Sequence, residues 1–500
     1  MSPLLSLVLV GDCDDDLLRT IASMALDDAP AELVVSPHGV SDEVRAGAQA
    51  ALGARLRWVD GQGGLLDRVR AAVGTWIGFL ESGDEVEPGV LESVSTHLRE
   101  RPGIDLLYTD EQWTDLKGEG IRTKPDWVPH YLEGCDYLGR LCLVRRDLVL
   151  GSGIEESAAF EWDLHLRCTE TTERIEHLPV VGVTRRRPPR TDAAFLASAQ
   201  QAVAERFARA DVRATVEVAD PAGYLRVWRA VPDPAPLVSI VIPTGGGRRA
   251  GTGDSSAVVE TCVRSLVALT TYPSWQVVLV PSEGTPPDVV EAVRSIAGDR
   301  LVVAPVTGEF SFSYSVNEGV RVAGDQSDLV VLLNDDTEVI EPRWLDRMVS
   351  VAQDPDVGAV GAKLLYSDGT IQHVGIVHDD SWLPVHALRG SDDDTRVFGT
   401  KVVDVDWPAV TAACMLVRRD LYVELGGFST DLPMAFNDVD FCHKVVASGR
   451  HVVCTPFATL FHHESATRTG TVRPFELEYV EHTASALAHL DPHVNHRSVR

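Results

Sequence analysis

The sequence has no long hydrophobic run and very little lysine, and each absence excludes a class of protein. No apolar stretch reaches the roughly 18 residues that a helix needs to cross a lipid bilayer. Lysine occurs at five of 500 positions, and 74 acidic residues outweigh 45 basic ones, giving a net charge of −29. Such a charge repels nucleic-acid backbones and anionic lipid headgroups. The sequence therefore argues against a membrane-spanning protein and against a nucleic-acid-binding protein.

The sequence also has no Cys-x-x-Cys pair, and its first apolar stretch is not expected to be a signal peptide. The eight cysteines are scattered and include no Cys-x-x-Cys pair, so they are expected to be reduced and mostly buried. The apolar stretch 4–10 has no basic residues before it and meets acidic residues after it, which predicts a first β-strand and not a signal peptide. The cytoplasm is the expected compartment.

The chain repeats itself. A length of 500 residues exceeds the roughly 250–300 that one hydrophobic core supports, so two or three domains are expected. Residues 141–148 and 413–421 share a Cys-x-Leu/Met-Val-Arg-Arg-Asp-Leu core. Three further pairs keep the same order: 6–10 with 239–243, 80–88 with 333–342, and 162–164 with 439–441. This pattern predicts two copies of one domain.

Each copy alternates short apolar strands with amphipathic stretches. A first strand is followed by a helical stretch (17–24 and 258–269) and then by a second apolar run (31–35 and 276–280). Such alternation predicts an α/β fold with a mainly parallel sheet and helices on both faces. An alanine-rich helical segment at 191–210 and a proline-rich stretch at 231–236 separate the copies.

An acidic cluster follows a predicted buried strand in the second copy. Asn334, Asp335 and Asp336 come directly after the strand at 328–333. In open α/β sheets ligands bind beyond the carboxyl ends of the strands, and carboxylate oxygens suit Mg²⁺ or Mn²⁺ shared with a diphosphate. An Asp-Asp pair alone is more often an ordinary turn or helix cap.

Two more groups could carry chemistry. Asp438 and Asp440 lie two residues apart, so in a helix they diverge and at most one faces a substrate. His462 and His463 could ligate a metal, although an isolated histidine pair in a loop is more often structural.

Together these motifs closely resemble the family 2 glycosyltransferases, specifically the tandem proteins of bacterial O-antigen and cell-wall polysaccharide synthesis. The matching stretches of the second half are 238–244, 310–313 with Asn317, 332–340, 358–364, 369–375, 411–428, 437–442 and 462–465. Residues 105–111, 124–129, 141–148 and 223–227 resemble the N-terminal module of the same proteins. The resemblance implies two tandem GT-A-like, Rossmann-like domains of the nucleotide-diphospho-sugar transferase type. The expected boundaries are 1–190 for a degenerate module, 191–235 for a helical connector and linker, 236–470 for the catalytic domain, and 471–500 for a C-terminal helix and tail.

The resemblance also implies an inverting, metal-dependent glycosyltransferase and assigns roles to the motifs. Asp438 falls at the position of the catalytic base, with Asp440 as a brace or acceptor contact. Mg²⁺ or Mn²⁺ is expected on Asp336 and on His462 or His463. The expected donor-binding residues are Pro243, Thr244, Asn317, Asn334 and Asp335. In-line displacement needs a carboxylate near the acceptor and a cation near the leaving diphosphate, in agreement with these roles.

Three stretches depart from the family pattern. Where an Asp usually follows the second strand, the chain has Pro281-Ser282-Glu283-Gly284, which puts nucleotide recognition in doubt. The loop 245–253 is long and rich in glycine, and it fits a diphosphate contact and an inert insertion equally well. In the first copy, residues 81–85 keep one aligned Asp, Asp84, so efficient metal-dependent catalysis is expected to be lost there.

The residues do not select the substrates. The first guess for the donor is dTDP-rhamnose or a UDP-hexose, and the acceptor is expected to be a growing cell-surface glycan or a lipid-linked oligosaccharide. Peripheral association with the inner membrane face would need a partner, because the chain shows no polybasic patch. Two alternatives stay open: both modules are active and add different linkages, or the chain is a non-catalytic sugar-binding scaffold.

Overall fold

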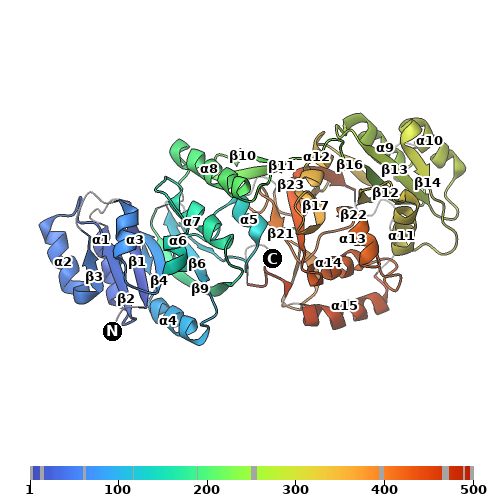
Figure 1. The fold of residues 1–500 in the computed structure, drawn as a ribbon. Coiled ribbons are helices and arrows are strands. Elements are labelled where there is room, and N and C mark those ends of the chain that lie inside the picture. The colour runs from blue at the N-terminus through green and yellow to red at the C-terminus, as the bar shows by residue number, and fades with distance from the viewer. Residues whose placement is uncertain are drawn as a thin grey trace. The chain divides into compact units, whose positions relative to one another are not determined.

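The computed structural model of the chain divides into two compact units (Figure 1). It describes residues 4–11, 16–59, 64–115, 118–187, 190–248, 256–392, 399–463, 472–487 and 490–495. One unit comprises Met1–Val212 with Val216–Leu225, and the other comprises Arg213–Thr215 with Arg226–Val494. Among the described helices, none combines the length and the apolar character that crossing a bilayer requires.

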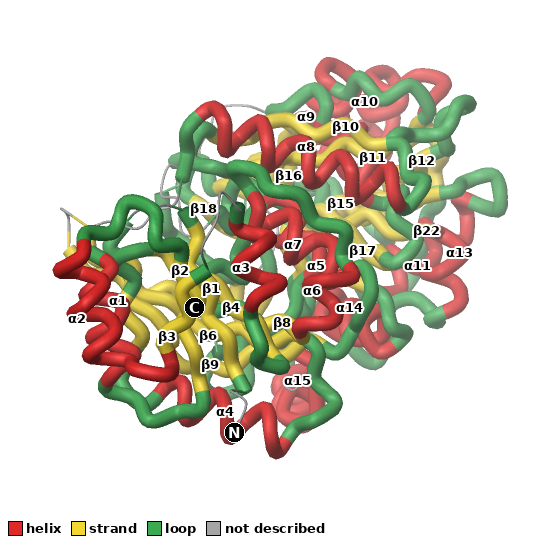
Figure 2. Tube along the Cα trace, turned by 60° about the vertical axis from the view of Figure 1, so that its left-hand side comes forward, coloured by secondary structure: helices red, strands yellow, loops and turns green. Residues whose placement is uncertain are grey.

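The first unit is built on one mixed sheet with the strand order β3-β2-β1-β4-β8-β6-β9-β5, in which β7 also pairs with β6. Figure 2 shows these strands together with the helices packed around them. The strands are β1 (Leu5–Val10), β2 (Ala31–Val35), β3 (Leu56–Trp58), β4 (Trp76–Glu81), β5 (Glu85–Val86), β6 (Leu106–Asp115), β7 (Gly118–Arg122), β8 (Leu143–Arg145) and β9 (Ile175–Arg185). The helices are α1 (Leu17–Ala25), α2 (Asp42–Leu52), α3 (Leu65–Ala71), α4 (Val90–Glu100), α5 (Pro129–Gly134), α6 (Arg146–Gly151), α7 (Phe160–Thr169) and α8 (Ala193–Arg209).

The second unit repeats this architecture. Its main sheet has the order β14-β13-β12-β15-β22-β17-β23-β16, which is the order of the first sheet strand for strand. These strands are β12 (Val238–Thr244), β13 (Trp275–Pro281), β14 (Leu301–Val303), β15 (Leu329–Leu333), β16 (Thr337–Val339), β17 (Val357–Leu365), β22 (Cys414–Arg418) and β23 (His451–His462). The short strand β18 (Ile371–His373) pairs with β17, β21 (Val405–Asp406) pairs with β23, and β19 (Ile376–His378) pairs with β20 (Pro384–His386). The helices are α9 (Val258–Leu269), α10 (Pro287–Ala297), α11 (Phe312–Ala323), α12 (Trp344–Val351), α13 (Arg419–Glu424), α14 (Asn437–Ala447) and α15 (Pro474–Leu487).

Both sheets are mainly parallel, with a reversed strand in the middle and another at one edge. In the second unit β14, β13, β12 and β15 run parallel, whereas β22 is antiparallel to both β15 and β17. Because β17 and β23 are parallel to each other and run in the direction of β15, the prediction of a mainly parallel sheet is confirmed, and β22 and β16 are the reversed strands. Parallel neighbours need a crossover connection, usually a helix, and the described residues between β17 and β22 form strands and turns without a helix.

The local predictions are confirmed where the hydrophobic periodicity is strong. The helical stretch predicted at 258–269 is α9, the strand predicted at 31–35 is β2, and the helix predicted at 191–210 is α8. Strands β12 and β15 are buried along their whole length, as central strands covered on both faces should be. The seven described cysteines are unpaired and buried. Because β12 and β15 are adjacent and parallel, the residues that follow them meet at one edge of the sheet.

Candidate active site

A cavity of about 710 Å³ opens in the second unit at the carboxyl ends of β12 and β15. It is large enough for a nucleotide-sized ligand. Seven of the residues predicted from the sequence line it: Pro243, Thr244, Asn334, Asp335, Asp336, Asp438 and His462. The structure thus brings together residues from β12, from the turn after β15, from α14 and from β23.

Asp335 is held by the end of β12. The hydroxyl of Thr244 donates to Oδ2 of Asp335 at 2.7 Å and accepts a hydrogen bond from the backbone N–H of Gly246 at 3.0 Å. Burial raises the pKa of Asp335 to about 7, and the neighbouring charge of Asp336 acts in the same direction. Thr244 therefore orients this carboxyl group, and a cation bound nearby would strongly favour its ionised form.

Asp336 and His462 lie in direct contact in the cavity. Nε2 of His462 lies 3.1 Å from Oδ1 of Asp336. Gln372, on β18, donates its amide N–H to the backbone carbonyl of His462 at 3.2 Å, which turns its Oε1 toward Nδ1 of His462 at 2.6 Å. Nδ1 therefore carries the proton of the neutral imidazole, and Nε2 presents its lone pair beside the carboxylate. One imidazole nitrogen and one carboxylate oxygen face each other as a ready pair of metal-ligand atoms.

Asp438 reaches the cavity from the first turn of α14. That helix begins after Phe436, whose φ of 58° is unusual for a residue other than glycine. The backbone N–H of Ala412 donates to Oδ2 of Asp438 at 3.0 Å, and the N–H of Val439 donates to Oδ1 at 2.9 Å. Each carboxylate oxygen has a second lone pair, so Asp438 can still accept a proton from a ligand hydroxyl.

Three predicted site residues do not line this cavity. Asn317 uses its side chain to hold the Gly427–Phe428 turn: its Oδ1 accepts from the N–H of Phe428 at 3.0 Å and from the hydroxyl of Tyr422 at 2.6 Å, and its Nδ2 donates to the carbonyl of Phe428 at 2.9 Å. A Cβ on Gly427 would lie 2.6 Å from Oδ1 of Asn317, which explains the glycine there.

The other two are Asp440 and His463. Asp440 pairs with Nζ of Lys444 and accepts from the hydroxyl of Tyr479, both at 2.8 Å. Asp438 and Asp440 point in different directions from the helix, as expected: Asp438 lines the cavity, and Asp440 contacts Tyr479 on α15. His463 lies 3.2 Å from Glu338 and 2.8 Å from the hydroxyl of Ser367. In the glycine-rich loop, residues 249–253 lie outside the described part of the chain.

Two important residues carry no signal of their own in the sequence. Gln372 orients His462 only because β18 pairs with β17. Glu476 on α15 is fully buried, and its Oε1 accepts from the N–H groups of Met434 and Ala435 at 2.8 and 2.9 Å. Both hydrogen bonds fix the segment that leads into α14. Glu476 thereby anchors the loop that presents Asp438.

Known proteins resemble this chain over most of its length. Residues 236–483 match the model of the family described as "Glycosyltransferase like family 2". The chain is 34% identical over 424 residues to the O-antigen biosynthesis protein RfbC of Myxococcus xanthus, covering 82% of this chain and 32% of that protein. It is 33% identical over 422 residues to the uncharacterized protein y4gI of Sinorhizobium fredii, covering 80% of this chain and 45% of that protein. The chain therefore spans less than half of the length of either relative.

Among solved structures, the mannosyltransferase PcManGT of Pyrobaculum calidifontis, in complex with GDP-Man and Mn²⁺, matches with a TM-score of 0.34 and 20% identity. The match covers 54% of this chain and 75% of that chain.

Proposed function

Because residues 236–483 belong to the glycosyltransferase-like family 2, we propose that this chain transfers a sugar from a nucleotide-diphosphate donor to a glycan acceptor, with inversion at the anomeric carbon. The reaction is assigned to the cavity at the ends of β12 and β15. The observation that carries this proposal is the meeting of Asp335, Asp336, His462 and Asp438 in that one cavity. They come from separate segments of the chain and have complementary chemistry.

The residues present fit a divalent cation. A cation with ligand bonds of about 2.1 Å places two neighbouring ligand atoms at right angles about 3.0 Å apart, and the separation of Asp336 Oδ1 and His462 Nε2 is 3.1 Å. We assign Mg²⁺ or Mn²⁺ to these two residues, with His462 and not His463 as the histidine ligand. A bound cation would neutralise charge on the leaving diphosphate.

Asp438 is assigned as the base. The N–H of Ala412 fixes one carboxylate oxygen, so the side chain is held in place without being neutralised by an ion pair among the described residues. An acceptor hydroxyl bound in the cavity would give its proton to Asp438 as it attacks the sugar. Asp440 is assigned a supporting role through Lys444 and Tyr479.

The donor is assigned to the ends of β12 and β15. Pro243, Thr244, Asn334 and Asp335 line that end of the cavity, and Ser282 lines it after β13, where the family usually has an Asp. The proposed donors are dTDP-rhamnose or a UDP-hexose. The acceptor is a growing cell-surface glycan or a lipid-linked oligosaccharide, reached at the membrane through a partner.

We further propose that the two units are tandem GT-A-like domains and that the first has lost catalysis. The identical strand order and the four repeated sequence stretches support this organisation. The proposed catalytic domain is 236–470, followed by a C-terminal helix and tail at 471–500. The first module covers 1–190, with a connector at 191–235.

The test is a screen of nucleotide sugars with the purified chain, with Mn²⁺ and with EDTA. Metal-dependent hydrolysis or transfer that is lost in Asp336→Ala, with an unchanged circular dichroism spectrum, supports the proposal. Metal-dependent binding without turnover of any donor would favour the scaffold alternative. Loss of one of two linkages in Asp84→Ala would show that both modules are active.

A further inference from the structure

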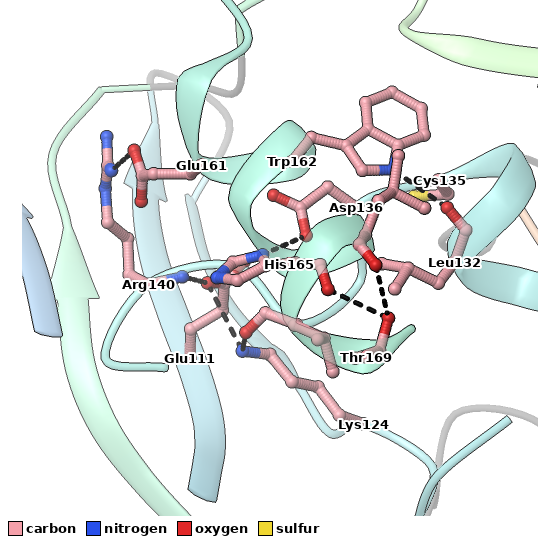
Figure 3. Close-up of polar contacts among 12 residues, drawn as sticks. Glu111, Lys124, Leu132, Cys135, Asp136, Arg140, Glu161, Trp162, His165 and Thr169 are labelled. Carbon is pink, nitrogen blue, oxygen red and sulfur yellow. Dashed lines mark hydrogen bonds and ion pairs between the residues drawn. The ribbon is translucent and has the colours of Figure 1, made fainter. Parts of the chain in front are cut away.

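The guanidinium of Arg140 lies among three carboxylates in the first unit. Figure 3 shows its contact with one of them, Glu161. Its NH2 pairs with Glu81 at 2.5 Å, its Nε lies 3.2 Å from Asp84, and its NH1 pairs with Glu161. Only 4% of Arg140 is exposed. Burial raises the pKa of Asp84 to about 6 against the opposing charge of Arg140. All three nitrogens of the guanidinium thus lie within ion-pair distance of a carboxylate, although Nε makes no hydrogen bond.

These carboxylates stand where the second unit has its proposed catalytic groups. Strand β4 pairs with β1 as β15 pairs with β12. Glu81 is the last residue of β4 and Asp84 follows it, at the same strand end where Asn334 and Asp336 follow β15. The repeat of 162–164 with 439–441 puts Glu161 at the position of Asp438. Arg140 therefore bridges the position of the metal ligand and the position of the base. This correspondence rests on the proposed tandem organisation.

A further buried carboxylate, that of Glu111, contacts the backbone of Arg140. Glu111 accepts from the backbone N–H of Arg140 at 3.0 Å and pairs with Lys124, Arg122 and Arg185 at 3.4–3.6 Å. These cations hold the pKa of Glu111 well below its usual range against the effect of its burial. Lys124 is buried as well, so this residue of the Lys124-Pro125-Asp126-Trp127 stretch stabilises the charged cluster behind the cavity.

Arg140 lines a cavity of about 570 Å³ in the first unit. Its rim includes the half-buried aromatic side chains of Phe195 and Tyr224 and the exposed carboxylate of Glu156, whereas Phe160 and Trp162 contribute to its lining from the core. Among the described residues that line it, five arginines (Arg68, Arg122, Arg140, Arg185, Arg190) face four acids (Glu81, Asp136, Glu156, Glu161). Behind this lining, Asp84 pairs with Arg140, and Glu111 pairs with Lys124.

The second unit's cavity differs in charge. Its described lining has four acids (Glu309, Asp335, Asp336, Asp438) and two arginines (Arg389, Arg473). That excess of acidic over basic side chains suits a divalent cation, whereas the lining of the first cavity has no acidic excess to offer one. A diphosphate in the first cavity would be repelled by the carboxylates there, and the guanidinium of Arg140 is already paired with three of them.

We propose that the first unit's cavity is a cation-independent carbohydrate-binding site, in which the Arg140 guanidinium takes the place of a divalent cation and the ligand is an uncharged glycan. Sugar hydroxyls donate to carboxylates and accept from guanidinium groups, so a cavity lined by both kinds of group satisfies both roles. The aromatic rim provides apolar surface for the C–H faces of the sugar rings. Such a site would hold the glycan without any transfer chemistry.

The binding test uses saturation-transfer NMR on the full chain in EDTA. The probes are methyl glycosides and disaccharides of rhamnose, galactose and glucose, and UDP and dTDP. At least one neutral probe should bind, and its signal should fall at least fivefold in Phe195→Ala and in Glu156→Gln but remain in Phe310→Ala, a matched aromatic substitution in the second cavity. The proposal is overturned if no saccharide binds, if the signal follows Phe310, or if UDP or dTDP displaces the sugar from the first cavity.

The metal test counts bound Mn²⁺ by electron paramagnetic resonance. The chain should bind one Mn²⁺ and Asp336→Ala none, and Arg140→Ala added to Asp336→Ala should restore one site, on Glu81, Asp84 and Glu161. If Asp336→Ala keeps a Mn²⁺ that Asp84→Ala removes, the first unit holds a metal and the proposal is wrong. If the chain with Arg140→Ala does not fold, the Mn²⁺ count of Asp336→Ala alone tests whether the first unit holds a metal. Neither test depends on turnover, so failure of the proposed transfer would leave both results interpretable.

Discussion

His462 Nε2 lies 3.1 Å from Asp336 Oδ1 because a three-residue strand connects their segments. In the sheet, β22 and β17 separate β15 from β23. Strand β16, which begins directly after Asp336, pairs with the end of β23 and places Thr337 opposite His462. The contact between the two residues assigned to the metal therefore forms because the chain passes from the end of β15 to the far edge of the sheet.

The first prediction separates the two histidines. His462→Ala should weaken Mn²⁺ binding at least 100-fold, since it removes an atom assigned to the metal, whereas His463→Ala should weaken it less than fivefold. Titration of each variant with Mn²⁺ by calorimetry measures both effects. Equal losses in the two variants would contradict the assignment of His462.

The second prediction concerns Gln372, which does not touch the assigned metal directly. Gln372→Leu removes the acceptor for Nδ1–H of His462, so the imidazole loses its fixed tautomer and orientation. Losses of such supporting contacts typically cost about 10–100-fold in metal affinity. Calorimetry should show this loss at unchanged thermal stability of the metal-free chain, and the imidazole ¹⁵N shifts of His462 should lose the pure Nδ1–H signature. Gln372→Glu, which keeps an acceptor, should restore much of the affinity.

The sequence predicts the strands, the helices and most of the cavity, but not the contacts that position the side chains. Strong periodicity and the four repeated stretches identify elements such as α9 and β2, and the strand-end rule brings Thr244 and Asp335 to one edge. Asn317 has the same polar character as a ligand contact, yet it stabilises the Gly427–Phe428 turn. That difference depends on the packing of α11 against a loop more than 100 residues away, which no local pattern encodes.

The third prediction tests the base. Asp438→Asn keeps the size of the side chain and its oxygen for the Ala412 N–H but removes the ability to take a proton. kcat should fall by about 10²–10⁴, with KM for the donor changed less than threefold. Asp440→Asn, the matched variant two residues along, should reduce kcat less than tenfold. If Asp440→Asn is the more damaging of the two, the roles are reversed.

The fourth prediction concerns pH and stability. Burial lowers the pKa of His443 to about 4, helped by the nearby His378. Since the unfolded state binds that proton near pH 6.5, this stability is fully present above pH 6.5 and is lost as the pH falls toward 4. The free energy of unfolding should drop by about 2 kcal/mol between pH 7 and pH 5 from this group. His373, whose pKa burial also lowers well below its usual value, acts with the same sign.

The measurement is urea unfolding at several pH values, followed by tryptophan fluorescence. Because the chain has two units, more than one transition is expected, and the transition that His443→Gln alters belongs to the second unit. In that variant the pH dependence of this transition should be weaker. An unchanged slope would show that His443 does not titrate between folded and unfolded states as its burial requires.

The last prediction assigns Glu476 a positioning role. Its carboxylate holds the N–H groups of Met434 and Ala435 directly before α14, so Glu476→Ala leaves two buried donors without their partner. Such a loss costs about 2–4 kcal/mol of stability. It also frees the loop that presents Asp438, so kcat should fall at least tenfold, whereas Mn²⁺ affinity should remain because Asp336 and His462 lie on other elements. Glu476→Gln, which keeps one acceptor oxygen, should recover most of both losses. If Glu476→Ala lowers stability but leaves kcat unchanged, Glu476 stabilises the fold without positioning Asp438.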